Sequence, residues 1–356
     1  MIKAAAPGKL YIAGEYAVVE TGFPAILVAL NQFVFCTVEK SSDVGSILST
    51  QYSENSIYWR RQDGQMVFDN RDNPFHYILS AIKITEDYAH ALGRDLSVYH
   101  LNVDSQLDSA DGKKYGLGSS AAVTVATVKA LCEFYQLDVT QDEIFKLSAI
   151  AHFEVQGNGS LGDIAASVYG GWIAYHSFDR QWLMEQRKTT SLIDLISMPW
   201  PELKIEQLKA PKNMTLLIGW TGSPASTSKL VDKVSIAKAR ESTEYQDFLA
   251  ESRLCIQKMI SGFRNGELSI IQEEIRHNRR ILQNLSVFSS VSIETDVLTN
   301  LCDTAEEFEG AAKTSGAGGG DCGIVAIDST KDLKSLINKW ADADIEQLDL
   351  SVHEIN

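Results

Sequence analysis

The segment Tyr115–Ala122 (YGLGSSAA), followed by an apolar run to Tyr135, is the sequence feature that most constrains the fold. Glycine has no Cβ, so its backbone turns tightly and approaches a ligand closely. Ser119 and Ser120 stand where a helix would begin, and small or apolar residues at helical spacing follow. A helix N-terminus presents free N–H groups and the positive end of the helix dipole. The segment therefore predicts a phosphate-binding loop that leads into a buried helix.

Other interpretations of this loop are open at this point. An isolated segment of this kind also fits a plain loop-to-helix turn with a serine cap. Gly116, Gly118 and Ala121 fit the G-x-G-x-x-A pattern of dinucleotide-binding folds, but that motif leaves a buried strand directly. Here the polar segment 104–114 separates the glycines from the strand-like run 96–103, which disfavours an NAD(P)-linked oxidoreductase. An ordinary P-loop is excluded, because G-x-x-x-x-G-K-[ST] does not occur.

Composition narrows the class of protein. The 356 residues are enough for two domains, and no apolar segment reaches the roughly 18 to 20 residues that span a bilayer. The N-terminus lacks the apolar centre of a signal peptide. Five cysteines without C-x-x-C pairing favour a reducing cytoplasm over a zinc site or a disulfide framework. We therefore expect a cytoplasmic protein, either a monomer or a homodimer.

The net charge of −15 at pH 7 limits the partners. Nucleic acids and anionic membranes both require a basic face, so neither is expected to bind. Phosphate-bearing substrates would be repelled by the overall field, and local cations, metal ions and helix N-termini must overcome that repulsion at the site. Lysines and arginines beside glycine-rich segments therefore become candidates for function.

Three further segments carry candidate residues. Lys9 follows a Pro-Gly pair that predicts a turn at the mouth of a strand near 10–13. Asp163 follows the glycine-rich loop 156–162 and precedes a short apolar helical turn. Taken alone, Lys9 is typical of a solvated surface charge, and Asp163 of a helix N-cap. The glycine-rich segment 313–322 precedes a strand, which predicts a loop whose backbone approaches a ligand or another loop.

Periodicity and turn residues predict the other elements. Strands are expected at 25–30, 33–38, 96–103, 172–175 and 214–220. Helices are expected at 75–92, from a capping box at 140–143 to about residue 154, at 245–262 and at 267–285. Prolines and weak periodicity predict a connection over 180–212.

Together these segments resemble the GHMP kinase superfamily, whose three motifs occur here in the right order. The matching segments are Pro7–Lys9 with Gly14–Val18, then Gly116–Ala122, then Lys313–Cys322. Gly162-Asp163, with Ser167 and Gly170-Gly171, resembles the stretch that supplies the catalytic aspartate in the mevalonate-kinase-like branch. The resemblance implies an α/β (α+β) fold of two domains, 1–185 with the phosphate loop and 186–356 on the substrate side. The active site would lie in the cleft between them.

Within the superfamily the likeness is greatest to the phosphomevalonate kinases. Tyr16 and Gln156-Gly157 stand where mevalonate kinases usually carry other residues. The segment 220–227 also resembles the corresponding segment of the phosphomevalonate kinases. Glu154 lies near the expected metal-binding glutamate, but its spacing differs. The resemblance implies ATP-dependent phosphorylation of (R)-5-phosphomevalonate to 5-diphosphomevalonate in isoprenoid biosynthesis. The alternatives are a mevalonate kinase or a diphosphomevalonate decarboxylase of the same fold, and a catalytically inactive GHMP-like binding protein.

The resemblance also implies roles for single residues. Lys9 and Asp163 would be catalytic, and Ser120 would help to hold Mg²⁺. The residues expected to bind ATP are Gly116, Leu117, Gly118, Ser119, Ser120 and Ala121. Those expected to bind the substrate are Tyr16, Ser223, Thr227, Gly318, Gly319 and Asp321. Lys229, Arg279 and Arg280 are further candidate cations for the substrate's carboxylate and phosphate.

Overall fold

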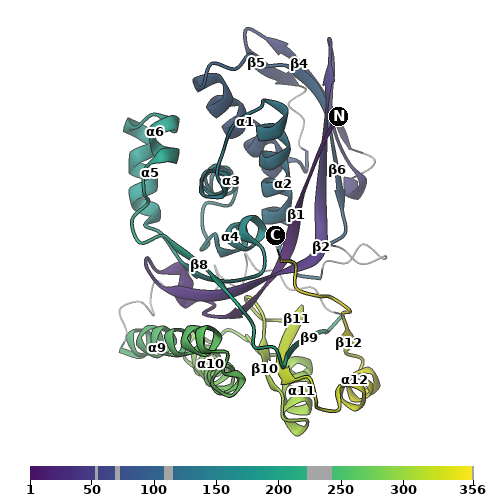
Figure 1. Ribbon diagram of the computed structural model, residues 1–356, viewed down its shortest axis with the longest axis vertical. Helices are drawn as coiled ribbons and strands as arrows, with labels where there is room; N and C mark the ends of the chain where they lie inside the picture. Colours follow the sequence, from purple (N-terminus) through teal and green to yellow (C-terminus); the bar gives the residue numbers. More distant parts are fainter. Residues whose placement is uncertain (53–54, 69–72, 108–114, 223–242, 355–356) are drawn as a thin grey trace.

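The computed structural model describes residues 1–52, 55–68, 73–107, 115–222 and 243–354 (Figure 1). An eight-stranded sheet with helices on one side adjoins a four-stranded sheet with its own helices. This arrangement confirms the predicted mixed α/β fold. None of the helices within those ranges combines the length and the apolar character required to cross a membrane.

The large sheet is built around one long strand, β2. The strand has 18 residues, of which those between 26 and 38 pair with β1 along one edge. Along the other edge, residues 24–28 pair with β7 and residues 34–41 with β6. The strand order is β5-β4-β3-β6-β2-β7-β8, with β1 on β2. The strands are β1 (Ile2–Ala13), β2 (Pro24–Ser41), β3 (Gly45–Ser49), β4 (Ser56–Gln62), β5 (Gln65–Phe68), β6 (Val98–Ser105), β7 (Trp172–His176) and β8 (Lys204–Leu208).

The helices beside this sheet enclose α2, the helix that follows the central glycines. Helix α2 (Ser119–Phe134) packs on β1 and β2 and is flanked by α1 (His76–Ala91), α3 (Gln141–Gln156) and α4 (Gly162–Tyr169). Its apolar residues are distributed around most of its circumference, and ten of its sixteen residues are buried. A helix that is apolar on all sides belongs inside a core. The core of the large sheet therefore fixes the direction in which the N-terminus of α2 points.

The four-stranded sheet has the order β10-β11-β9-β12 and is antiparallel. Its strands are β9 (Met214–Trp220), β10 (Ala311–Thr314), β11 (Cys322–Asp328) and β12 (Glu346–Gln347). Its helices are α9 (Thr243–Asn265), α10 (Leu268–Ser289), α11 (Asp296–Glu307) and α12 (Leu333–Asp342). A small core around Leu301 and Trp340 joins α11 and α12 to this sheet.

Helix α9 and the C-terminal segment both contact the large sheet. Helix α9 contacts β2 and the short 3₁₀ helix η1 (Ala17–Val19), which follows β1. The C-terminal segment returns to the large sheet, where the His353 N–H donates to the Ala29 carbonyl at 2.9 Å. The Gly171 N–H donates to the His353 carbonyl at 2.6 Å, so the end of the chain lies against β2 (Figure 1).

Most predicted elements are confirmed, including the helices near 75–92, 245–262 and 267–285. The capping box is also confirmed, because Thr140 and Glu143 each bond the other's main-chain N–H. The predicted connection over 180–212 is wrong. That region forms α5 (Arg180–Thr189), α6 (Leu192–Ser197) and β8, and side-chain caps from Asp179 and Ser191 start the two helices.

Two details near the N-terminus also differ from expectation. The Pro-Gly pair before Lys9 does not turn the chain, because β1 continues through it with an irregularity in register between Pro7 and Lys9. The two strands expected at 25–30 and 33–38 are the single strand β2. The domain boundary after residue 185 stays a prediction, and we note that β8, which follows it, pairs with β7 in the large sheet.

Candidate active site

A cavity of about 560 Å³ lies where the three glycine-containing segments meet. This volume is in the range of small-molecule binding sites. The predicted site residues that line it are Lys9, Tyr16, Gly116, Gly118, Ser119, Ser120, Asp163 and Asp321. Leu117, Ala121, Gly318 and Gly319 are not part of its lining. Ser223, Thr227 and Lys229 lie outside the described residues.

The loop before α2 can adopt its shape only with glycine at two positions. Gly116 and Gly118 have φ angles of +78° and +77°, a region that other residues rarely adopt. A Cβ on Gly118 would lie 2.8 Å from the Lys9 Cε, and one on Gly116 would lie 2.7 Å from the Asp321 carboxylate. The absence of a side chain at Gly116 and Gly118 therefore lets Asp321 of the third motif and Lys9 of the first motif approach this loop.

The N-terminus of α2 is suited to an anion. The first helical hydrogen bond runs from the Ala122 N–H to the Gly118 carbonyl, so the N–H groups of residues 119–121 precede it and have no partner within the helix. Two of those residues, Ser119 and Ser120, line the cavity. These amides and the helix dipole both favour a phosphate there.

Lys9 is part of the cavity wall and not a solvated surface charge. Its main-chain N–H donates to the Leu117 carbonyl at 2.8 Å, which fixes β1 against the glycine loop. The residue is only 8 % exposed. Burial lowers the pKa of its ammonium group, while the carboxylates of Asp163 and Asp321 act in the opposite direction. A partly desolvated cation among carboxylates is a suitable contact for a phosphate.

Asp163 lies in the first turn of α4 and faces the same cavity. Leu161, with a φ of +64°, occupies the N-cap position, so the interpretation of Asp163 as an N-cap is wrong. Its Oδ1 accepts a hydrogen bond from the Ile164 N–H at 3.0 Å, which orients the carboxylate. Asp163 is the carboxylate with the largest electrostatic effect on Lys9.

His152 and Tyr77 form a wall of the cavity whose role the sequence does not reveal. The His152 Nε2 and the Ser120 Oγ form a hydrogen bond of 3.2 Å, and the imidazole stacks on the Tyr77 ring at 4.8 Å. Burial lowers the pKa of His152, which favours the neutral imidazole. Nothing in the sequence placed Tyr77 beside His152.

The loop after β10 is held by residues of the first motif. The Tyr16 hydroxyl donates to the Ala317 carbonyl at 2.5 Å, so its predicted role as a donor to the substrate stays a prediction. Gly318 and Gly319 do not line the cavity and lie against Ile293. The Gly319 N–H donates to the Ile293 carbonyl at 2.8 Å, and a Cβ on Gly318 would lie 2.2 Å from the Ile293 oxygen.

Two groups of candidate residues lie outside the cavity. Glu154 is bound by Arg187, with 2.5 Å between the carboxylate oxygen and the guanidinium nitrogen. It does not line the cavity, which argues against a metal role there. Arg279 pairs with Glu294 at 2.7 Å and with Asp303 at 2.8 Å beside a separate hollow, which Arg280 also lines.

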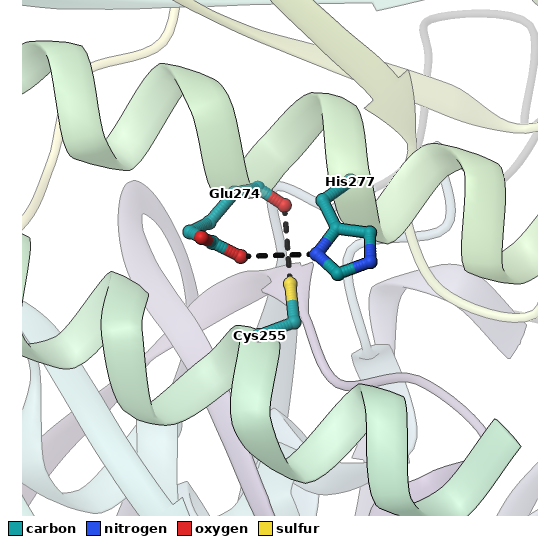
Figure 2. A group of neighbouring side chains, drawn as sticks. All are labelled: Cys255, Glu274 and His277. Carbon is teal, nitrogen blue, oxygen red and sulfur yellow. Dashed lines mark hydrogen bonds and ion pairs between the residues drawn. The ribbon is translucent and has the colours of Figure 1, made fainter. Parts of the chain in front are cut away.

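Cys255, Glu274 and His277 form a cluster between α9 and α10, with ligand atoms within 4.8 Å of one another (Figure 2). All three groups have protein partners. The thiol donates to the Glu274 main-chain carbonyl at 3.2 Å, and the Glu274 carboxylate contacts His277 at 3.2 Å and Lys258 at 3.6 Å. Burial raises the pKa of the thiol, whereas metals bind the thiolate. We interpret this cluster as a contact between helices.

Comparison of the chain with known proteins identifies its family. Residues 76–171 match the GHMP kinases N terminal domain, and residues 259–345 match the GHMP kinases C terminal domain. The chain is 38 % identical to the phosphomevalonate kinase of Streptomyces sp. (strain CL190), over 97 % of this chain and 96 % of that relative. It is 30 % identical to the mevalonate kinase of Thermococcus gammatolerans, over 90 % of this chain and 87 % of that relative.

A solved structure agrees with these sequence matches. The phosphomevalonate kinase of Streptococcus pneumoniae in complex with phosphomevalonate and AMPPNP superimposes with a TM-score of 0.86 and 32 % identity. The superposition covers 99 % of this chain and all of that chain. The sequence matches and the fold agree, and the resemblance seen in the sequence is confirmed: the chain belongs to the GHMP kinase family.

Proposed function

We propose that this protein is a phosphomevalonate kinase, which transfers the γ-phosphoryl group of ATP to the phosphate of (R)-5-phosphomevalonate. The observation that carries the proposal is the meeting of Lys9, the N-terminus of α2 and the loop 315–321 in one cavity. The Streptomyces and Streptococcus relatives bear this name, and the latter was solved with both phosphomevalonate and an ATP analogue.

The chemistry requires positioning and charge neutralisation more than covalent participation of the protein. The amides at the start of α2 bind the phosphates of ATP. Lys9 lies between that helix and the third motif, where its ammonium group screens the acceptor phosphate and the transferred group from each other. Lys9 is only 8 % exposed, and this partial removal from solvent strengthens its electrostatic effect.

A phosphate acceptor needs no strong base. Its second pKa is about 6, so the attacking oxygen is already largely ionised at pH 7. A mevalonate kinase must instead take a proton from an alcohol. We infer that Asp163 acts mainly by orienting Lys9 or the metal, because it is the carboxylate that most strongly affects Lys9.

The oxygen donors at the cavity wall fit Mg²⁺. The Ser120 hydroxyl and the Asp163 carboxylate both line it, and Mg²⁺ binds one or two carboxylates or hydroxyls together with substrate phosphates. When bound there, the ion would neutralise charge on the phosphate oxygens. The hydrogen bond between His152 and Ser120 orients the Ser120 side chain for this purpose.

ADP release tests the assignment directly. A coupled assay with Mg-ATP would compare phosphomevalonate, mevalonate and diphosphomevalonate, with Asp163→Ala as a control. We expect ADP release with phosphomevalonate alone, a diphosphate product, and strongly reduced turnover in the variant. Turnover of mevalonate in place of phosphomevalonate would keep the fold and overturn the specificity. No turnover with any acceptor would favour the inactive binding protein.

A further inference from the structure

A buried ion pair joins the first motif to the third. Glu15 follows β1, Lys313 belongs to β10, and 2.5 Å separates the Glu15 Oε1 from the Lys313 Nζ. The side chains are 3 % and 0 % exposed. The two residues are 298 positions apart in the chain, so this contact exists only when both sheets are assembled.

The same carboxylate contacts the glycine loop. The Glu15 Oε1 also accepts a hydrogen bond from the Gly316 N–H at 3.3 Å, and the next residue, Tyr16, binds the carbonyl of Ala317. Two consecutive residues of the first motif therefore hold two consecutive residues of the third. Glu15, Gly316 and Ala317 all line the cavity.

Stability alone is a weak explanation for this pair. Removing two charges from water costs free energy, and well-packed apolar residues often serve as well or better. The Glu15 Oε2 adds to this cost in free energy, because it is buried and has no hydrogen-bond partner within the described residues. The arrangement therefore keeps a costly carboxylate at the edge of the cavity, where its other oxygen binds the loop.

We propose that Glu15 is a positioning residue for the acceptor side of the site. It fixes the Gly316 amide, and with it the loop 315–321, while Lys313 compensates its charge. This inference rests on the proposed function, because the loop is taken to bind phosphomevalonate. Glu15 takes no part in the chemistry.

Two double variants separate positioning from charge. Glu15→Gln with Lys313→Met removes both charges but keeps an oxygen that accepts from Gly316. Glu15→Ala with Lys313→Met removes both charges and that oxygen. We expect the alanine pair to raise the KM for phosphomevalonate about tenfold or more above that of the glutamine pair, with similar KM values for ATP. Equal KM values for phosphomevalonate in the two folded pairs would overturn the proposal.

A measurement on the wild-type protein covers the case in which a variant does not fold. Hydrogen exchange at the Gly316 amide should be slow without any ligand, because that half-buried N–H is bonded to the Glu15 carboxylate. Exchange at the rate of an unstructured peptide would overturn the proposal. Wild-type turnover of phosphomevalonate is measured beside the variants. If wild type fails to turn it over, the proposed function is wrong, whereas an active wild type with equivalent pairs refutes only the role of Glu15.

Discussion

The two glycine loops of the cavity are built in opposite ways. The loop 116–118 continues into α2, and the core beneath that helix fixes its position. The loop 315–321 continues into strand β11 and is held by Glu15, Tyr16 and the segment around Ile293. The first is thus positioned mainly by its own helix, with one main-chain bond from Lys9 to Leu117, whereas the second is positioned by residues distant in sequence. We infer that the first binds the shared donor ATP and the second sets the acceptor.

The largest expected effect is at the residue that both loops approach. Lys9→Ala should lower kcat by about 10³-fold, because it removes the cation between donor and acceptor phosphates. Asp163→Asn should cost less, about 10- to 100-fold, if Asp163 orients and does not act as a base. Steady-state kinetics of the two purified variants gives the comparison. A greater loss in the Asp163 variant would contradict the proposed division of roles.

Alanine at one glycine of each loop should separate the substrates. Gly118→Ala places a methyl group against Lys9 and the ATP side, whereas Gly318→Ala places one against Ile293. We expect the first to raise the KM for ATP and the second the KM for phosphomevalonate, each by about 10- to 100-fold.

Gly93→Ala is the matched control for both substitutions. Its φ is +78° and its Cβ would meet nothing within 4 Å, so it should cost only about 1 kcal/mol of stability. Both KM values should match wild type in this control. Equal effects of Gly118→Ala and Gly318→Ala on the two substrates would remove the distinction between the loops.

The pH profile of kcat/KM should show that Lys9 must be protonated. Burial lowers its pKa below the ordinary value of 10.5, so activity should fall on the alkaline side at a lower pH than an exposed lysine would give. Arginine stays protonated over this range, and Lys9→Arg should therefore shift the fall to higher pH. An alkaline limb that is unchanged in this variant would assign the titration to another group.

The smallest effect is expected outside both loops. Glu154→Gln breaks the ion pair between Glu154 and Arg187, and both of these side chains are about 30 % exposed. The substitution should therefore lower the free energy of unfolding by only about 0 to 1 kcal/mol. Because Glu154 does not line the cavity, kcat/KM should stay within about twofold of wild type. A loss comparable to that of Asp163→Asn would restore Glu154 as a metal ligand.

The loops also show which features could be predicted from sequence. Helix α2 and its N-terminus follow from local residue types, and the capping box at Thr140 follows in the same way. Helices α5 and α6 were missed although Asp179 and Ser191 cap them, because prolines and polar residues obscured their short apolar faces. The spacing of apolar residues predicts a helix only when the helix is long enough for that spacing to repeat.

The sequence predicted which residues form the candidate site better than it predicted the contacts between them. The motifs supplied Lys9, Ser120 and Asp163, which the fold places on one cavity. The pairing of Glu15 with Lys313 could not be predicted, because a single sequence contains no signal for a contact between such distant positions. Each residue was already inside a motif, but only the assembled sheets show that they meet.

A crystal structure with AMPPNP and phosphomevalonate would test the central claim most directly. The two glycine loops should hold different substrates on the two sides of Lys9. We expect the triphosphate of AMPPNP at the amides of residues 119–121, and the phosphate of phosphomevalonate between Lys9 and the loop 315–321. An acceptor phosphate bound away from both Lys9 and that loop would contradict the account.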